Sequence, residues 1–213
     1  MSDESLRFSH EAMATTFQVM IDGEERAYAQ QAADAVFAEI DRIEKEISRF
    51  IDGSDISQMN HAAPEHWIPV GTHTCECLKC AAKVTADTNG AFDITVGPLL
   101  KCWRNPDKSL RQPSDEELAK ARGLVGMSHI ELDEGGNRVR VKVEGVKVDL
   151  GGIGKGYAVQ RASELLKEWS IDSALINGGN SSTFALGKLT GHDGWPVGVG
   201  GVEDEEKAPY ILE

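Results

Sequence analysis

The chain has 213 residues, of which 40% are hydrophobic, and it carries a formal net charge of −13 at pH 7. A chain of this length can bury a substantial core, in one large domain or two small ones. Its acidity argues against nucleic acid as a partner, because such binding depends largely on Lys and Arg that neutralise phosphates. No apolar run approaches the ~18 residues that a membrane span requires.

The N-terminus is acidic and lacks the basic and apolar regions of a signal peptide. We therefore expect a cytoplasmic protein as the sequence is written, or an extracytoplasmic one if a leader has been removed. The first predicted element is a strand over residues 9–20, in which Phe17 and Val19 share one face.

A long amphipathic helix is predicted over residues 25–50. Apolar residues at three- and four-residue spacing form its buried stripe, namely Ala32, Val36, Ile40, Ile43 and Ile47. The segment Ser48–Phe50 ends this helix, and Ser54 with Asp55 can cap a short helical turn that follows.

Three of the four cysteines, Cys75, Cys77 and Cys80, form a C-x-C-x-x-C run that could hold a metal or an iron–sulfur cluster. Residues 75–88, however, have the pattern of a helix, and Cys77 and Cys80 would share its buried face. A tetrahedral metal site would need a fourth ligand, and nothing places Cys102 nearby. We therefore favour cysteines that pack as small buried apolar residues, with a metal site as the alternative.

The run Asp149–Tyr157 combines four glycines with Lys155. Alternating apolar residues before it predict a hairpin over residues 139–150 that turns at Gly145. Helical periodicity follows, so the glycines lie where a strand meets a helix N-terminus, which favours an anion. Neither the Walker A loop nor the Rossmann fingerprint fits, since Gly156 follows the lysine and the preceding strand is hairpin-like. The run indicates either a site for a phosphorylated ligand or a glycine turn with a solvated lysine.

Two carboxylates stand out in apolar surroundings. Asp93 lies between Phe92 and Ile94, so it would face the interior or a cleft and need a hydrogen-bond donor or a metal. The alternative is a turn aspartate bonded to local amides. Asp149 ends an apolar strand and could accept from a ribose hydroxyl, lie near a cation or cap the following helix. The segment Asn177–Asn180 is a second glycine-rich strand exit, and two such exits facing one cleft would suit a dinucleotide.

The remaining elements complete an α+β fold with a mostly antiparallel sheet and packed helices. We expect one domain over residues 1–213, incomplete at its C-terminus. The first of these elements are a surface loop and helix within residues 111–122, followed by a strand, a glycine loop and a second strand within residues 171–184. A strand over residues 195–202 comes next. Residues 203–206 then form a solvated loop, and a short strand follows at Tyr210–Leu212. An exposed edge near Tyr210 could pair with a second copy of the chain and form a homodimer.

Five motifs in order along the chain resemble the ApbE family of flavin transferases, and the resemblance runs from about Glu11 to Val202. They are Met13–Thr15; Ser48–Phe50 with Ser54–Asn60; Gly90–Trp103; Asp149–Tyr157; and Ile176–Asn180. The resemblance implies an ApbE-like core and an enzyme that uses FAD to place FMN on a protein threonine or serine. In the implied reaction an acceptor hydroxyl attacks the FMN phosphorus and AMP is released, while Mg²⁺ neutralises charge on the pyrophosphate.

The resemblance also implies the site residues. By this similarity the backbone carbonyl of Gly152 would be one magnesium ligand, and the FAD contacts would be Met13, Phe50, Ala91, Phe92, Asp93, Asp149 and Lys155. Aromatic and thioether groups suit the flavin and adenine rings, while backbone amides and Lys155 suit the pyrophosphate. The implied partners are FAD and an acceptor flavoprotein with a Thr or Ser flavinylation site. No catalytic residue is assigned.

Three distal segments of the family pattern, T-S-G, H-x-x-D-P and D-A-x-x-T, do not occur in this sequence. In the family the last of them supplies side-chain ligands for the metal, and one carbonyl alone is not a magnesium site because the ion takes near-octahedral oxygen coordination. Smaller departures are Ala14, where the family prefers Gly, and Gln160, where it usually has Asp. Three interpretations stay open. The chain is the N-terminal portion of a complete transferase, a protein that binds FAD or another nucleotide without transfer, or an interaction module whose glycine loop is structural.

Overall fold

The structure is a computed structural model that describes residues 5–133, 135, 137–199 and 210–212. The chain divides into two compact units, the first formed by Met1–Asp41 with Lys155–Glu213 and the second by Arg42–Gly154. Both units contain antiparallel strands and helices, so the expected α+β class is confirmed. The expectation of one domain over residues 1–213 stays a prediction, because two compact units can belong to one domain.

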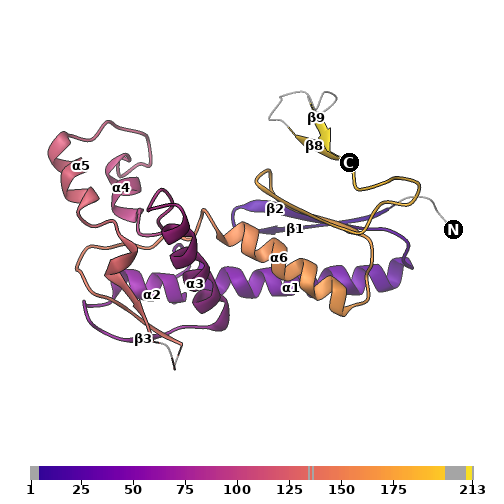
Figure 1. The fold of residues 1–213 in the computed structure, drawn as a ribbon, viewed down its shortest axis with the longest axis horizontal. Coiled ribbons are helices and arrows are strands. Elements are labelled where there is room, and N and C mark those ends of the chain that lie inside the picture. The colour runs from indigo at the N-terminus through magenta and orange to yellow at the C-terminus, as the bar shows by residue number, and fades with distance from the viewer. Residues whose placement is uncertain (1–4, 134, 136, 200–209, 213) are drawn as a thin grey trace. The chain divides into compact units, whose positions relative to one another are not determined.

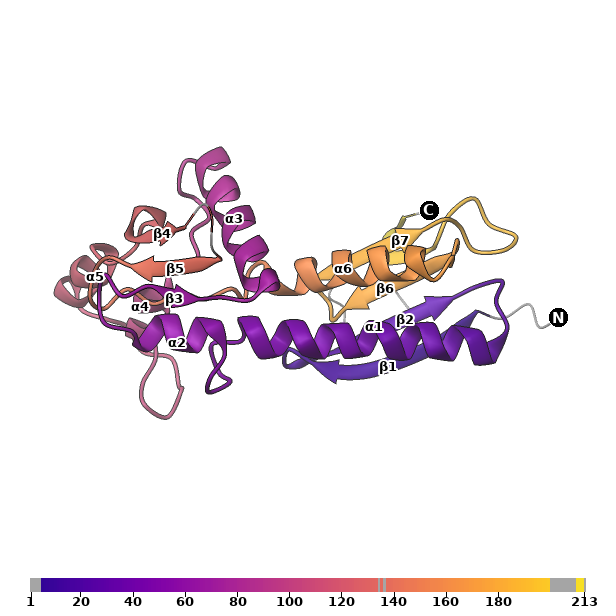
Figure 2. The same ribbon diagram turned by 90° about the horizontal axis from the view of Figure 1, so that it is seen from below.

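The first unit is built on a four-stranded antiparallel sheet in the order β1-β2-β6-β7. Its strands are β1 (Leu6–Ala12), β2 (Thr15–Ile21), β6 (Ala174–Gly178) and β7 (Ser182–Leu186). Figures 1 and 2 show helix α6 (Gly154–Glu168) and the N-terminal part of α1 (Arg26–Ile47) over one face of this sheet. Val19 and its cross-strand partner Ile176 are fully buried, so the two central strands, β2 and β6, contribute side chains to the hydrophobic core.

Helix α1 follows the predicted pattern, since its apolar stripe is buried: Ala32, Val36, Ile40, Ile43 and Ile47. It ends at Ile47, where the segment Ser48–Phe50 begins as expected. The short helix α2 (Asp55–His61) follows, and the Ser54 hydroxyl accepts a hydrogen bond from the Ser57 amide at 3.0 Å. The predicted N-cap is therefore confirmed.

The predicted single strand over residues 9–20 is wrong, because the chain reverses at Met13 and Ala14. Ala12 pairs with Thr15, so Met13 and Ala14 form the whole loop of a hairpin between β1 and β2. Their φ angles are 51° and 56°, which matches the two positive φ angles of a type I′ turn. Such turns usually contain Gly, Asn or Asp. Met13 and Ala14 are none of these, so the sequence does not predict a turn at this point.

Replacing Ala14 with Gly is expected to raise the free energy of unfolding by about 1 kcal/mol, because glycine adopts a positive φ without a Cβ clash. Urea unfolding followed by circular dichroism measures the change. Ala38→Gly is a matched control: Ala38 is exposed in α1, and there the same replacement is expected to cost about 1 kcal/mol. Equal losses in both variants would contradict the left-handed conformation of Ala14.

The second unit contains a three-stranded antiparallel sheet in the order β3-β5-β4, which Figure 2 shows beside helix α3. Its elements after α2 are β3 (Ile68–Pro69), α3 (Thr72–Asp87), α4 (Gly97–Cys102), α5 (Asp115–Arg122), the 3₁₀ helix Met127–His129, β4 (Ile130–Leu132) and β5 (Arg138–Val141). The predicted helix within residues 111–122 is thus confirmed as α5. None of the helices in the described part of the chain combines the length and apolar composition that a membrane span requires.

Strands β8 (Val197–Val199) and β9 (Tyr210–Leu212) pair with each other and form a separate two-stranded sheet in the first unit. The predicted strand over residues 195–202 is confirmed for Val197–Val199, and it does not include residues 195 and 196. Residues 200–202 lie outside the described residues, as does the predicted solvated loop at 203–206. One edge of β9 is hydrogen-bonded to β8. The homodimer stays a prediction.

The predicted hairpin over residues 139–150 is wrong. Strand β5 does contain alternating apolar residues, but its two edges are taken by β3 and β4. The segment after the turn, residues 146–150, instead makes hydrogen bonds to other parts of the unit, such as that from the Val148 amide to Asn60 Oδ1 at 2.7 Å. Its apolar residues are still buried. Alternation therefore identified the buried side chains, but it does not specify the partner strand.

Helix α3 carries three of the cysteines and is closed by Asn89 and Gly90, which both have positive φ as expected of a left-handed cap. Cys77 is fully buried, whereas Cys80 is exposed, so the prediction that both share the buried face is wrong. Leu78 and Ala81 complete the buried face instead. Burial raises the pKa of the Cys77 thiol to about 12.

Treatment of the native protein with iodoacetamide at about pH 8 is expected to alkylate Cys80 and to spare Cys77, because only an accessible thiolate reacts. Peptide mass spectrometry measures the modified fraction of each residue. After unfolding in guanidinium both residues should be modified. Modification of Cys77 in the native protein at the rate of Cys80 would contradict the burial of Cys77.

Candidate functional site

Two segments that are far apart in the sequence run side by side in the second unit. Val96 forms a parallel bridge with Lys147, and the Asp149 amide donates to the Ile94 carbonyl at 2.8 Å. The approach is closest at Gly97, where a Cβ atom would lie 2.6 Å from the Lys147 carbonyl oxygen. Only glycine fits this position, which lets α4 begin directly against the other segment.

A cavity of about 350 Å³ lies where these segments meet, and we name it the Asp93–Asp149 cavity. Ligand pockets range from about 300 to 1,000 Å³, so this one suits part of a large ligand or a small whole one. It brings together five of the eight predicted site residues: Ala91, Phe92, Asp93, Asp149 and Gly152. The rest of its lining is Ile94, Val96, Leu100 and Gly151.

Asp93 joins two loops at the wall of this cavity. Its Oδ1 accepts from the amide of Thr95 at 2.8 Å and from the Thr95 hydroxyl at 2.6 Å, while its Oδ2 accepts from the Met127 amide at 3.0 Å. The buried Thr95 hydroxyl also accepts from the Gly126 amide at 2.7 Å. Asp93 is therefore the turn aspartate of the alternative interpretation and also a residue that lines the cavity.

Asp149 is held by one local and one distant partner. Its Oδ1 accepts from the Gly151 amide at 2.8 Å, and its Oδ2 lies 2.9 Å from Arg49 Nε. The guanidinium carbon of Arg49 lies 4.3 Å from the centre of the Phe50 ring, and Phe50 is 79% exposed. The predicted site residue Phe50 is thus linked to the cavity through Arg49 rather than lining it.

Arg49 and Asn60 are the two structural residues of this site that sequence reasoning missed. Asn60 is buried, and its side chain donates to the Val148 carbonyl at 2.9 Å and accepts from the Val148 amide at 2.7 Å. The Asn60 side chain thus makes the hydrogen bonds to Val148 that a partner strand would make in the predicted hairpin. These bonds fix the backbone directly before Asp149. Arg49 lies within Ser48–Phe50, one of the five motifs of the family resemblance, and this motif is the sequence feature that could have identified it.

Met13 and Lys155 belong to the first unit. Met13 lies in the loop between β1 and β2, and Lys155 is a half-buried residue in the first turn of α6. Gly179, in the turn after β6, has a φ of 64° and would direct a Cβ into the Thr15 side chain, so this glycine-rich exit requires glycine. Contact of Met13 and Lys155 with FAD stays a prediction.

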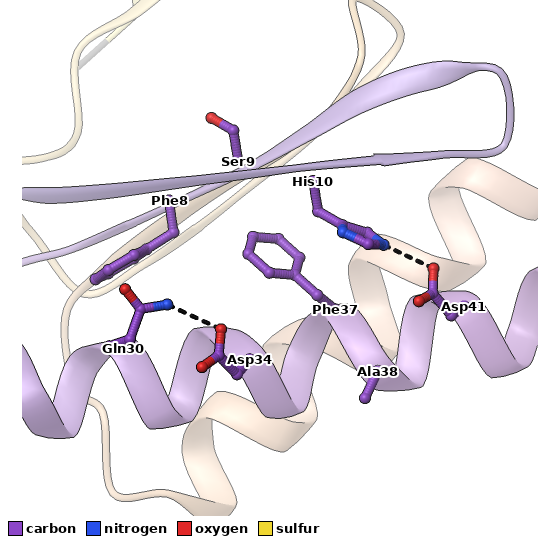
Figure 3. A pocket seen from close by; sticks show the side chains of 8 residues that line it. All are labelled: Phe8, Ser9, His10, Gln30, Asp34, Phe37, Ala38 and Asp41. Atoms are coloured by element: carbon purple, nitrogen blue, oxygen red, sulfur yellow. Dashed lines mark hydrogen bonds and ion pairs between the residues drawn. The ribbon is translucent and has the colours of Figure 1, made fainter.

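A second cavity, of about 500 Å³, lies between β1 and α1 in the first unit, and Figure 3 shows its lining. His10 Nε2 lies 2.7 Å from Asp41 Oδ1, and the His10 ring stacks on Phe37 with centroids 5.1 Å apart. Ser9 points away from this pair in Figure 3, because neighbouring residues of a strand face opposite sides. Ser9 is therefore not placed for activation by this pair, which is best explained as a link between strand and helix.

The predicted magnesium ligand, the Gly152 carbonyl, belongs to a residue of the Asp93–Asp149 cavity. The nearby carboxylates of Asp93 and Asp149 already accept hydrogen bonds from protein groups, and Asp149 also forms an ion pair with Arg49. Among the described residues no group of three or more His, Cys, Asp or Glu is placed to bind a metal ion. These residues alone do not complete a magnesium site, so the Gly152 carbonyl stays a single predicted ligand.

The fold and the cavity define an α+β protein with a ligand-sized site built from residues 91–100 and 149–152. The chain belongs to the ApbE family, whose family model matches residues 13–212.

A Klebsiella pneumoniae protein named FAD:protein FMN transferase is 28% identical over 204 residues, which are 94% of this chain and 58% of that protein. The structure of an ApbE protein from Thermotoga maritima matches with a TM-score of 0.82 and 28% identity, covering 99% of this chain and 66% of that one. The apo form of the flavinyl transferase ApbE from Pseudomonas stutzeri matches with a TM-score of 0.81 and 26% identity, covering 93% and 66%. The chain thus spans less than two thirds of the length of each of these relatives.

Proposed function

We propose that this chain carries FAD-binding residues of an FAD:protein FMN transferase, which moves FMN from FAD to a threonine or serine hydroxyl of an acceptor protein. The observation that carries the proposal is that five residues predicted from the family resemblance line one cavity. The name of the Klebsiella pneumoniae relative supports the same activity.

The lining of the Asp93–Asp149 cavity suits a ring system with polar edges. Phe92 and Leu100 offer apolar surface to the faces of a ring. Gly152 leaves room beside Phe92, since a Cβ atom there would lie 3.3 Å from the Phe92 ring. The carboxylates of Asp93 and Asp149 retain acceptor capacity for N–H or O–H groups of a bound nucleotide.

Arg49 acts as a positioning residue in this proposal. Its ion pair with Asp149 fixes the carboxylate, and its stacking on Phe50 fixes the guanidinium. The exposed ring of Phe50 is then available to a flavin or adenine ring. Met13 and Lys155 are proposed as further FAD contacts, with Lys155 near the pyrophosphate.

In the proposed transfer, the acceptor oxygen forms a new bond to the FMN phosphorus. The bond from that phosphorus to the bridging pyrophosphate oxygen breaks, and AMP leaves with that oxygen. The proton of the acceptor hydroxyl passes to solvent, so that the products are the flavinylated acceptor, AMP and one proton. Magnesium, with the Gly152 carbonyl as one proposed ligand, would supply charge neutralisation at the pyrophosphate.

Titration with FAD, followed by flavin fluorescence, tests the binding part of the proposal. Phe92→Ala and Asp149→Asn are expected to weaken binding by about tenfold each, the equivalent of one lost contact of about 1.4 kcal/mol. Val143→Ala, a partly exposed residue of the same unit outside the cavity, is the control and should bind normally. Binding that is unaffected by both cavity substitutions would remove the proposed site.

Incubation with FAD, Mg²⁺ and a peptide that carries an acceptor threonine tests the transfer itself. Fluorescent peptide and an equal amount of AMP, measured by mass spectrometry, are the expected products. Binding of FAD without AMP release would overturn transfer by this chain and favour the second interpretation, a nucleotide-binding homologue. The absence of both would favour the structural interpretation of the glycine loop.

A further inference from the structure

A second cavity of the second unit lies between α4 and α5 and measures about 860 Å³; we name it the α4–α5 cavity. Its charged lining consists of five cations and one carboxylate: Lys101, Arg104, Arg111, Lys120, Lys147 and Glu117. The whole chain has 22 Lys and Arg residues and a net charge of −13. A concentration of cations in so acidic a chain is the opposite of what its composition predicts.

The single carboxylate is fully engaged by one of the cations. Glu117 accepts from Arg111 Nη1 at 3.0 Å and from Nη2 at 2.6 Å. The Arg111 guanidinium lowers the pKa of Glu117 to about 2, and Glu117 in turn raises the pKa of Arg111. The charges of Glu117 and Arg111 cancel, so the lining has four further positive charges, those of Lys101, Arg104, Lys120 and Lys147.

None of these four charges is neutralised by a partner among the described residues. Lys147 and Arg104 donate to backbone carbonyls, which satisfy hydrogen bonds without cancelling charge. Lys101 and Lys120 are exposed and have no ion-pair partner in the part of the chain that the structure describes. The cavity therefore presents a positive potential that attracts acidic groups.

Apart from Asn105, the rest of the lining is largely apolar. Its apolar lining, which we call the base, includes Pro98 and Ala121, which are buried, and Leu124, which is half-buried. The segment that connects α4 to α5 also carries two exposed apolar side chains, since Trp103 is 46% and Leu110 is 75% exposed. A lining that combines basic side chains with this apolar base, and a connecting segment with exposed Trp and Leu, favour a surface that binds polypeptide.

Helix α4 contributes to both cavities of this unit. Leu100, and Val96 just before the helix, line the Asp93–Asp149 cavity, whereas Pro98 and Lys101 line the α4–α5 cavity. The two sites are thus separated by about the diameter of one helix, roughly 10 Å. An extended chain covers that distance with three or four residues.

We propose that the α4–α5 cavity binds an acidic segment of the acceptor polypeptide, whose carboxylates contact Lys101 and Lys120 and whose apolar side chains cover the base. The proposal rests on the proposed function, because it assumes a polypeptide acceptor. Cations on flexible side chains from separate segments suit carboxylates spaced along a chain better than one compact phosphate. The short distance to the Asp93–Asp149 cavity allows a hydroxyl of the same segment to reach that site.

Fluorescence anisotropy with a short fluorescein-labelled peptide, in which Asp and Leu alternate around one Thr, tests the proposal. The same peptide with Asn in place of Asp is the neutral control. The double variant Lys101→Glu with Lys120→Glu is expected to weaken binding of the acidic peptide by about tenfold, an effect that decreases with added salt. Lys79→Glu with Lys83→Glu, two exposed lysines of α3 in the same unit, should leave binding unchanged.

Glu117→Gln is expected to tighten peptide binding, because it frees Arg111 while a glutamine still completes the capping box of α5. FAD binding should be unaffected by the substitutions in the α4–α5 cavity. Failure of the unsubstituted chain to bind FAD would count against the proposed function alone. Three outcomes would overturn the inference: equal binding by the Lys101 and Lys120 double variant, equal binding of the neutral peptide, or full displacement of the acidic peptide by millimolar inorganic phosphate at constant ionic strength. Self-association that the double variant abolishes, seen by sedimentation without peptide, would also overturn it in favour of a second copy of the chain.

Discussion

Asp93→Ala is expected to lower the free energy of unfolding by about 4 kcal/mol, because it leaves the amide and hydroxyl of buried Thr95 and the amide of half-buried Met127 without their charged acceptor. The Asp93 carboxylate is the common partner of Thr95 and Met127, and Thr95 is fully buried. Asp93→Asn retains one acceptor oxygen and should cost about half as much. Chemical unfolding of the three proteins measures the series.

Asp107 provides an unusually close control for this experiment. It makes the same local pair of hydrogen bonds, accepting from the amide of Ser109 at 2.9 Å and from its hydroxyl at 2.6 Å. Asp107 is exposed and no further donor is recorded for it among the described residues. Asp107→Ala should therefore change stability by less than about 1 kcal/mol. Equal losses for Asp93 and Asp107 would show that the bond to Met127 and the burial of Thr95 contribute nothing.

The same series has a second measurement, the affinity for FAD. Asp93→Asn is expected to fold and to weaken FAD binding by about tenfold, since the loop that carries Met127 loses its anchor beside the cavity. Normal FAD affinity in the folded Asn variant would place Asp93 among structural residues only. That result would leave the stability prediction intact and remove Asp93 from the proposed site.

Asn60→Ala is expected to lower the free energy of unfolding by about 3 kcal/mol. The side chain satisfies both backbone groups of Val148, which is fully buried, so its removal leaves an amide and a carbonyl unpaired. Asn60→Asp would keep the acceptor but set a carboxylate against the Val148 carbonyl, and it should be at least as costly. Guanidinium unfolding measures both variants.

Gln58→Ala is the matched control for Asn60. Gln58 lies on the same short helix, and its side chain donates to the Gly53 carbonyl at 2.8 Å, but it is exposed. Its removal should cost less than about 1 kcal/mol because water replaces the lost donor. A loss at Gln58 as large as that at Asn60 would mean that α2 itself, rather than the bond to Val148, sets the stability of this region.

Local patterns predicted several elements well. The stripe of α1 and the Ser54 cap depend on residues within a few positions of one another, so periodicity and capping chemistry were sufficient. The five cavity residues were found through the family resemblance, because each of their motifs is short and weak alone. The α+β class followed from the mixture of helical and alternating patterns.

The errors at the turn, the hairpin and Arg49 concern information that a local pattern does not contain, whereas that at Cys80 concerns which residues of a correctly predicted helix face the interior. The turn at Met13 and Ala14 lacks the residues that usually adopt positive φ, so one strand was expected where two exist. The valines after Gly145 are buried, yet the backbone of Val148 bonds to the side chain of Asn60, which lies 88 positions away. Arg49 was missed as a site residue for the same reason, since its partner Asp149 is remote in sequence.

The pairing of β2 with β6 has a consequence for how the protein is made. Val19 pairs with Ile176, and the whole of Arg42–Gly154 lies between these strands. A ribosome releases the chain from its N-terminus, so every residue of the second unit emerges before β6 does. Until then the edge of β2 that will pair with β6 has no partner and is open to aggregation. Strand β2 is therefore synthesised before the whole second unit, yet it completes its hydrogen bonds only after that unit has been made.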